Sequence, residues 1–371
     1  MAQEAHELIE RDALVPDRPW SFDALHLAGA RAALAPRHRA TTFLGHPLEP
    51  AASGPIGLDQ LERFLRHPVR AFLRERLDIW VGDRTHDFED AIPIDLDGLE
   101  QWHIADRVLQ ALLAGAELAQ CLDAERARGA LPPGQLADAV LNRIAAPLAD
   151  LVAAGQHAMP PLSLDAHVDL ADGRSVVGTV AGVRGDVVHS VTYSKLNPAH
   201  RLLAWVRLLV LSATWPERPF SAHTVGRSPR RGATIAVADI APLGPDASSR
   251  KTAAESHLAA LVEVFERGMC EPLPLYVGTS AAWVSAVAEG RDPDRAAAAA
   301  WVSGWDFSKE DKDAEHMLVL GGALGLGDVL ELAGLPRGDE AAWGPPGSTR
   351  FAAYAHRIWD ALLTREQMVD R

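Results

Sequence analysis

Apolar residues recur at helical spacing soon after the first fifty residues of the chain. The apolar positions follow one another at intervals of four, four and three residues, and they are Leu61, Leu65, Val69 and Phe72. That spacing brings them onto one face of a helix that begins near residue 58. Pro68 lies inside the pattern, and proline has no backbone N–H to offer the helical ladder. The pattern therefore predicts a buried helix that bends or breaks beside Pro68.

The middle of the chain changes from helical spacing to strand spacing. Helical patterns continue through residues 98–155, and stretches rich in β-branched residues then predict strands from about residue 162 to residue 193. The pairs Asp172-Gly173 and Gly185-Asp186 are typical of tight turns between such strands. A helix from about residue 199 follows, and further strands are predicted at residues 233–237 and 273–277.

The last third of the chain predicts helices that alternate with loops. They cover residues 253–267, 281–288, 294–301, 327–333 and 351–363. With the strands, this order predicts a mixed α/β (α+β) fold, in which helices flank a central mixed sheet and substantial helical additions surround it. The sequence has no internal repeat and no phosphate-binding loop of the Gly-x-x-x-x-Gly-Lys-Ser/Thr type, so we expect no ATP-driven motor within it.

The first 55 residues differ from the remainder in their proline content. Six prolines interrupt this stretch: Pro16, Pro19, Pro36, Pro47, Pro50 and Pro55. Such a stretch predicts a linker or an extended arm. We therefore expect an N-terminal arm over residues 1–55 and one domain over residues 56–371, with a helical insertion at about residues 98–155.

Composition excludes several broad classes of protein. The chain has 371 residues, of which 48% are hydrophobic and 23% are charged, as expected for a soluble globular protein with a large core. No apolar run approaches the roughly 18 residues that would span a bilayer, and the N-terminus lacks a signal pattern, so we expect a cytoplasmic protein. Two cysteines, Cys121 and Cys270, cannot form a disulfide framework or a four-thiolate metal site.

Net charge limits how this chain could meet nucleic acid. The formal charge is −14, whereas phosphate neutralisation by cations supplies most DNA-binding affinity, so a local basic surface would be needed. The first predicted helix carries a stripe of arginines at spacings of three and four, and a predicted hairpin tip near residue 230 carries a second group. These tentative DNA-contacting residues are Arg63, Arg66, Arg70, Arg74, Arg227, Arg230 and Arg231. An ordinary solvated helix face and a solvated turn explain the same residues.

The segment over residues 176–211 has the strand–turn–strand–helix order of a restriction-endonuclease-like active site without its acidic residues. Such a nuclease needs a carboxylate on the first strand and an acid-x-Lys triplet on the second, because two carboxylates hold the catalytic Mg²⁺. The positions that would carry this chemistry are Ala181 or Gly182, Thr192 and Ser194, together with His103 at the place of a metal-binding histidine. We therefore predict a degenerate site with no metal and no cofactor.

A larger resemblance joins these observations. Residues 61–77, with their His67-Pro68 step, resemble the first helix of the RecB-type nuclease superfamily, and residues 96–102 extend the match. Together with residues 203–209, 271–275 and 298–301, the ordered set is similar to the C-terminal domain of the RecC family, the gamma subunits of exodeoxyribonuclease V. The resemblance covers about residues 56–365, so we expect a C-terminal piece of a longer subunit.

The resemblance implies a role without catalysis by this chain. RecC-like subunits hold RecB-like and RecD-like motor subunits together and help to separate the strands of a forked or double-stranded DNA end during recombinational repair. The C-terminal domain is the part associated with strand separation and with contacts to the motor subunits. On this basis we expect a chain that is not itself an enzyme and makes no contact with a membrane.

Two other interpretations stay open. The chain could be an active Mg²⁺-dependent nuclease whose carboxylates are displaced, and the nearby acids are Asp165, Asp169, Asp172 and Asp186. Two of these acids lie in predicted turns, and the second strand has no acid-x-Lys triplet. The chain could also be a protein-interaction scaffold without DNA contact, which its acidic charge favours.

Overall fold

The protein divides into two units, residues 1–41 and residues 42–371. The computed structural model describes residues 24–34, 43–51, 54–82, 96–304 and 308–371. Within the first unit, the described residues form helix α2 (Ala24–Leu34). The boundary predicted between residues 55 and 56 falls inside the second unit, where Phe43, Leu44 and Leu48 pack against the main core. That boundary stays a prediction.

A mixed sheet of seven strands forms the centre of the second unit. The strands are β1 (Ile56–Gly57), β2 (Leu162–Asp169), β3 (Ser175–Arg184), β4 (Val187–Lys195), β5 (Ser221–Arg227), β6 (Ile235–Ile240) and β7 (Glu366–Asp370). Their order is β1-β3-β4-β5-β6-β7, and β2 pairs with β3 beside this path. The β1–β3 and β4–β5 pairs are parallel, and the others are antiparallel. The predicted mixed sheet flanked by helices is confirmed.

Strands β3 and β4 are joined only near their turn. Their registered pairs are Val183 with Val188 and Arg184 with Val187, next to the Gly185-Asp186 turn. β4 pairs with β5 over a longer stretch, in parallel register from Val187 with Ser221 to Val191 with Val225 and again at Lys195 with Arg227. The hairpin therefore opens toward its far end.

One face of the sheet is covered by helices from distant parts of the chain. They are α3 (Leu58–Arg66), α9 (Pro198–Thr214), α10 (Ala247–Cys270) and α15 (Arg350–Arg365). Helix α9 is buried along most of its length because it lies between the sheet and α10, and Trp205 and Leu209 are almost fully inaccessible to solvent. The main core joins these helices to Val176 and Val180 of β3.

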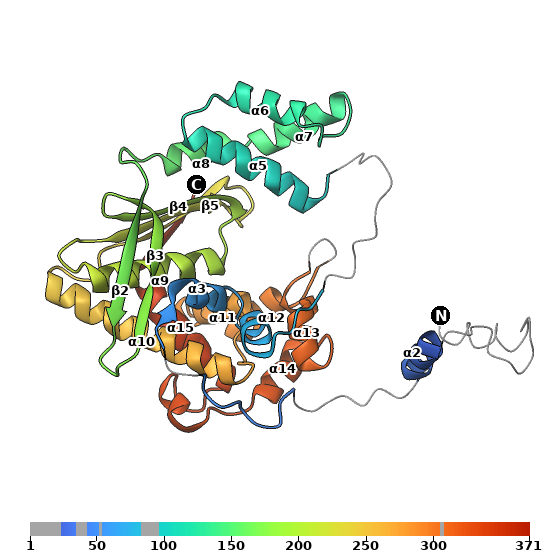
Figure 1. Ribbon diagram of the computed structural model, residues 1–371, viewed down its shortest axis with the longest axis vertical. Coiled ribbons are helices and arrows are strands. Elements are labelled where there is room, and N and C mark those ends of the chain that lie inside the picture. The colour runs from blue at the N-terminus through green and yellow to red at the C-terminus, as the bar shows by residue number, and fades with distance from the viewer. Residues whose placement is uncertain (1–23, 35–42, 52–53, 83–95, 305–307) are drawn as a thin grey trace, which may run out of the picture. The chain divides into compact units, whose positions relative to one another are not determined.

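The opposite face carries a separate group of helices over residues 98–155, which Figure 1 shows above β4 and β5. They are α5 (Gly98–Leu113), α6 (Leu118–Ala127), α7 (Gln135–Ala145) and α8 (Leu148–Gly155). Asp97 begins α5 with a side-chain cap, since its Oδ1 accepts the amide hydrogens of Leu99 and Glu100. These helices form a second core with Tyr193, Val225 and Val237 of the sheet.

Further helices and helical turns belong to the remainder of the second unit. They are α4 (Pro68–Ala71), a π-helical turn η1 (Phe72–Arg76), α11 (Val277–Ala288), α12 (Pro293–Trp301), the 3-10 turn η2 (Glu310–Lys312), α13 (Ala314–Leu320), α14 (Leu326–Ala333) and the 3-10 turn η3 (Gly338–Ala342). Among the described helices, none combines the length and the apolar character that crossing a membrane requires.

The predicted interruption at Pro68 is confirmed. Helix α3 ends at Arg66, and His67 leaves helical geometry with φ −159° and ψ 87°. Pro68 then takes the first position of α4, where the missing N–H costs nothing because that amide has no intrahelical partner. His67 Nδ1 accepts the amide hydrogen of Arg70 at 3.1 Å, so this side chain caps the new helix.

The strand predicted at residues 273–277 is wrong. This segment forms no strand before α11 begins at Val277, although Leu273 and Leu275 are buried. Pro272 and Pro274 lack the N–H groups that a sheet ladder requires, so buried apolar side chains here fill the core without a strand. Strands β1, β5 and β7 were not predicted.

Candidate functional site

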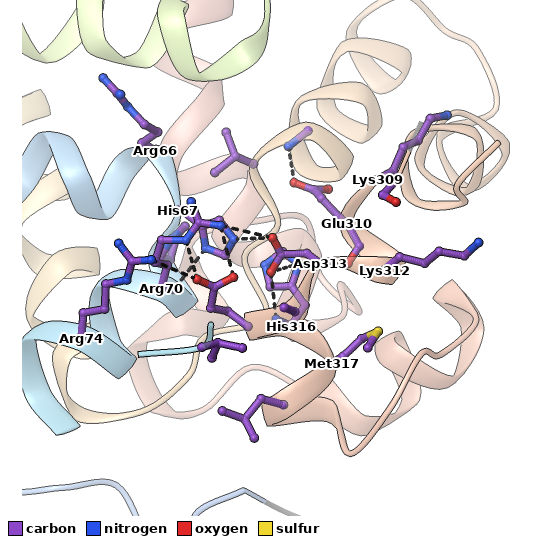
Figure 2. Close-up of a pocket in the computed structure, with 18 of the residues that line it drawn as sticks. Arg66, His67, Arg70, Arg74, Lys309, Glu310, Lys312, Asp313, His316 and Met317 are labelled. Atoms are coloured by element: carbon purple, nitrogen blue, oxygen red, sulfur yellow. Dashed lines mark hydrogen bonds and ion pairs between the residues drawn. The ribbon is translucent and has the colours of Figure 1, made fainter. Parts of the chain in front are cut away.

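A groove of about 1670 Å³ opens beside the break between α3 and α4. One wall comes from α3, α4 and η1, and the other comes from η2 and the first turns of α13 (Figure 2). Three members of the predicted arginine stripe line this groove, namely Arg66, Arg70 and Arg74. The structure therefore brings most of the stripe together at one concave surface.

Arg63 does not line the groove. Its Nη1 lies 2.6 Å from Asp59 Oδ2, and its Nε donates to Glu75 Oε1 at 2.8 Å. These two carboxylates raise the pKa of the Arg63 guanidinium, with Glu75 the larger cause. Arg63 serves as a tie between α3 and η1.

Arg70 and Arg74 share one buried carboxylate across the groove. Arg70 donates to both oxygens of Glu315, at 2.7 and 3.1 Å, and this raises the pKa of the Arg70 guanidinium. Arg74 Nη2 lies 3.6 Å from Glu315 Oε1, and its guanidinium lies 4.6 Å from the centre of the Trp80 ring. Carboxylates therefore pair with three of the four arginines of the predicted stripe, and DNA contact by the stripe stays a prediction.

Three other cations at the groove have no carboxylate partner among the residues that the structure describes. Arg66 is exposed at the end of α3, Lys312 is exposed at the end of η2, and Lys309 Nζ donates only to the carbonyl of Ala299 at 2.7 Å. In total, five cationic side chains line the groove against the three carboxylates of Glu310, Asp313 and Glu315. This is a local positive excess in a chain whose formal charge is −14.

Two histidines and one aspartate meet at the groove wall. His67 Nε2 lies 3.0 Å from Asp313 Oδ2, and the rings of His67 and His316 lie 4.7 Å apart at an interplanar angle of 34°. Hydrogen bonding from His67 and the nearby His316 hold the pKa of the Asp313 carboxyl well below its usual range despite its burial. Burial lowers the pKa of His316.

The positions on β3 and β4 that were predicted to be degenerate nuclease ligands lie on the opened part of the β3–β4 hairpin. Ala181 is exposed, and Gly182 has φ +77°, where a Cβ would stand 3.1 Å from the carbonyl oxygen of His189. Ser194 Oγ accepts a hydrogen bond of 2.8 Å from Trp102 Nε1 on α5, and Thr192 Oγ1 accepts the amide hydrogen of Ser194. Helix α5 therefore covers the positions on β4.

The four acids of the displaced-carboxylate interpretation are spread over separate partners. Asp165 accepts from Thr179 at 2.6 Å, and Asp169 pairs with His167 at 3.0 Å. Asp172 and Asp186 lie in turns, as expected, where they bind Arg174 and Arg218 respectively. Across the described ranges, the compact group of metal-ligand side chains contains none of these acids.

Neither His103 nor the basic hairpin tip lines the groove. His103 is exposed on α5 and contacts the ring of Trp102 at 5.1 Å. Arg227 lies 4.4 Å from the centre of the Tyr193 ring. Arg230 pairs with Asp370 at 3.1 Å, and Arg231 is exposed in the β5–β6 turn. DNA contact by the tip arginines stays a prediction.

The sequence interpretation missed the far wall of the groove. Lys309, Lys312, Asp313 and His316 lie within eight residues of one another, and the Asp313-x-x-His316 spacing puts two potential ligands on one turn of helix. That spacing alone is common. The signal becomes specific only beside His67, from which Asp313 is separated by 246 positions.

Comparison with known proteins assigns most of the chain. The profile of the RecC C-terminal domain family matches residues 53–288. RecBCD enzyme subunit RecC of Mycolicibacterium smegmatis is 38% identical over 360 residues, which is 96% of this chain and 32% of that protein. The Mycobacterium tuberculosis subunit is 36% identical over 365 residues, 96% of this chain and 31% of that protein, and the Escherichia coli subunit is 32% identical over 165 residues, 43% of this chain and 14% of that protein.

This comparison contradicts the prediction that the chain is not an enzyme. The relatives are named as a subunit of the RecBCD enzyme, and this chain spans about a third of the length of the two mycobacterial relatives. Strands β3 and β4 carry no acidic residue. This observation concerns those two strands alone and does not decide whether the subunit takes part in the activity of its enzyme.

Proposed function

Because this chain belongs to the RecC C-terminal domain family, we propose that it acts in DNA repair by recombination, as part of a RecC-type subunit. Within that role, we propose that it contacts a forked or double-stranded DNA end where the two strands separate. Its partners in this proposal are RecB-like and RecD-like motor subunits.

The cationic excess of the groove is the observation that carries the proposed DNA contact. Arg66, Lys309 and Lys312 form no ion pair with a described carboxylate, and Arg66 and Lys312 are exposed to solvent. Each phosphate that such a cation neutralises releases condensed counterions, which is the main source of affinity for DNA. The acidic remainder of the chain would repel DNA and so favour contact at this groove.

An aromatic side chain beside the groove supports contact with a separated strand. Trp80 is 68% exposed, lines the groove and lies under the guanidinium of Arg74. Exposed aromatic rings stack with unpaired bases, and this interaction is tolerant of sequence. A strand leaving a fork could therefore find both phosphate contacts and a stacking platform here.

The test is the binding of labelled forked DNA to the purified chain over a series of salt concentrations. Replacing both Arg66 and Lys312 by alanine removes two unpaired cations from the groove. We expect the affinity to fall about tenfold or more, and the slope of log K against log salt to decrease by roughly two.

A matched variant separates this effect from a general change in charge. Arg126→Ala with Lys251→Ala also removes two positive charges, but these residues lie on α6 and α10, outside the groove. We expect this variant to bind forked DNA nearly as the unchanged chain does. Equal affinity for forked DNA and an equal salt slope in the groove variant and the unchanged chain would refute the proposed contact.

The proposed motor partners call for a separate measurement. Purified RecB-like and RecD-like subunits, mixed with this chain, should elute together with it in size-exclusion chromatography. Elution of the three proteins in separate peaks at micromolar concentration would argue against direct assembly through this part of the subunit.

We also infer that the sheet descends from a restriction-endonuclease-like core. The opened β3–β4 hairpin and the helix α9 that follows it support this relation, because that order of elements matches the nuclease segment. Superposition on an active nuclease, with Ala181 and Ser194 compared with its ligand positions, is the observation that would decide it.

A further inference from the structure

His67, Asp313 and His316 form a compact group of metal-ligand side chains, which we call the His–Asp–His cluster. One ring nitrogen from each histidine and one carboxylate oxygen lie within 4.8 Å of one another. His67 comes from the break between α3 and α4, whereas Asp313 and His316 come from the start of α13 (Figure 2). The chain thus brings three ligand atoms together from two distant segments.

We propose that the His–Asp–His cluster binds one divalent transition-metal ion of the zinc class. Two imidazole nitrogens and one carboxylate oxygen suit Zn²⁺, Co²⁺ or Ni²⁺, whereas Mg²⁺ and Ca²⁺ prefer sites made of oxygen. The cluster lies at the wall of an open groove, so water can complete the coordination shell.

The surroundings of His316 leave Nε2 as its available ligand nitrogen, although Nδ1 is the ring atom that lies 3.7 Å from Asp313 Oδ1. His316 is 3% exposed, and its Nδ1 lies 3.0 Å from the carbonyl oxygen of Glu310. That contact places the ring proton on Nδ1 and leaves the lone pair on Nε2. Ligating histidines usually donate their second nitrogen to a carbonyl or carboxylate in this way, which fixes the tautomer. Tyr276 and Trp301 pack against the ring and hold its orientation.

His67 must exchange one hydrogen bond for the ion. Its Nδ1 accepts the amide hydrogen of Arg70, so the neutral ring carries its proton on Nε2, facing Asp313. An ion on Nε2 moves that proton to Nδ1 and breaks the bond to the Arg70 amide. The backbone bond from Ala71 N to His67 O, at 3.0 Å, remains to hold the turn.

Arg70 is the nearest positive charge to the cluster. Its Nη2 lies 3.5 Å from Asp313 Oδ2, and this positive charge opposes the binding of a cation at the cluster. The two shorter contacts of the Arg70 guanidinium, however, are hydrogen bonds to Glu315. The Glu315 carboxylate therefore offsets the guanidinium charge. Arg70 and the exchange at His67 together favour a site of micromolar rather than nanomolar affinity.

A bound ion would connect the break between α3 and α4 to the start of α13. Metal ligands from segments far apart in the sequence stabilise the folded state, because the site does not exist in the unfolded chain. The ion would also add positive charge to the wall of the groove. This inference concerns the metal alone and does not depend on whether the groove binds DNA.

Titration of the chelator-stripped chain with ZnCl₂ in a calorimeter tests the inference. We expect saturable binding of one ion per chain, a higher melting temperature with zinc, and reversal by EDTA. Cobalt in place of zinc should give visible absorption bands of a nitrogen–oxygen site with low coordination number. Asp313→Asn keeps a capping oxygen for α13 but removes the charge, so its zinc affinity should be lower by about tenfold or more.

A control variant and a second ligand variant make the result decisive. Asp292 caps α12 as Asp313 caps α13, through a bond to Arg295 N, and lies outside the cluster. Asp292→Asn should therefore bind zinc normally. His316→Ala should lose the site, and if it does not fold, Asp313→Asn decides. No saturable zinc binding below about 1 mM, or unchanged affinity in Asp313→Asn, would overturn the proposal.

Discussion

Two stacked histidines lie on neighbouring strands. Both ring nitrogens of His223 face oxygen atoms, with Nδ1 at 2.6 Å from Asp239 Oδ1 and Nε2 at 3.1 Å from the Ala154 carbonyl. His189 stacks on it with ring centres 5.5 Å apart. Burial, followed by the charge of His223, lowers the pKa of His189 to about 4. The buried His189 ring therefore favours its neutral form.

The depressed pKa of His189 predicts a pH-dependent stability. The unfolded chain binds this proton below about pH 6.5 and the folded chain only below about pH 4, so the free energy of unfolding should fall as pH falls through that interval. Partial exposure limits the contribution of this residue to about 1 kcal/mol. Urea unfolding of the unchanged chain and of His189→Gln at pH 7 and pH 5 measures it. The same pH dependence in both proteins would contradict the assignment.

At the scale of secondary-structure elements, helix α11 depends on a side chain from another element for its N-terminal cap. Its own N-cap residue, Tyr276, offers no side-chain bond. The carboxylate of Glu310 instead accepts from Gly278 N and Thr279 N, both at 2.8 Å, and from Thr279 Oγ1 at 2.6 Å. A carboxylate at this end also suits the positive end of the helix dipole. The turn η2 is thereby tied to α11.

Removing this carboxylate should weaken the fold. Glu310→Ala leaves the amides of Gly278 and Thr279 without their acceptor, and we expect the free energy of unfolding to fall by about 1–3 kcal/mol. Glu310→Gln keeps one acceptor oxygen, so its effect should be smaller. Glu289→Ala, which removes an exposed carboxylate at the other end of α11, serves as the control for lost charge. Equal stability of the two alanine variants, measured by chemical denaturation, would refute the capping role.

Elements that depend on the local sequence pattern were predicted from the sequence. Elements that depend on pairing with distant strands were missed. The spacing of Leu61 and Leu65, and the position of Pro68, predicted the first helix and its break. Strand β5 escaped prediction because Gly226 and His223 give it weak strand character, and its pairing with β4 and β6 supplies the stability. The groove escaped for the same reason, since its two walls meet only through tertiary packing.

At the scale of the whole second unit, one sheet separates two cores. The main core lies under α9 and α10, and the second lies between the sheet and the helices of residues 98–155. Tyr193 belongs to the second core and donates a hydrogen bond to the Ile144 carbonyl at 3.3 Å. The helical segment is therefore joined to the sheet by apolar packing together with the bonds from Trp102 and Tyr193.

Packing in the second core should therefore be sensitive to a loss of side-chain volume. Leu148 is fully buried on α8, and Leu148→Ala should lower the free energy of unfolding by about 2–5 kcal/mol through lost burial and a cavity. Leu136→Ala, at a site that is 47% exposed on α7, should cost less than about 1 kcal/mol. Denaturant unfolding of both variants provides the comparison. A similar loss in the two would mean that the second core contributes little.

The sheet order also determines when the chain can finish folding. Ile56 of β1 pairs with Val176, and Ile240 of β6 pairs with Glu366 of β7. Both β1 and β6 therefore pair with a strand that lies more than 100 residues later in the chain. Pairings of such high sequence separation slow folding, because a large loop must close before any contact forms. We therefore expect β6 to be an unpaired edge of the sheet during synthesis until residues 366–370 leave the ribosome. An edge of that kind is a site for wrong pairing with other nascent chains.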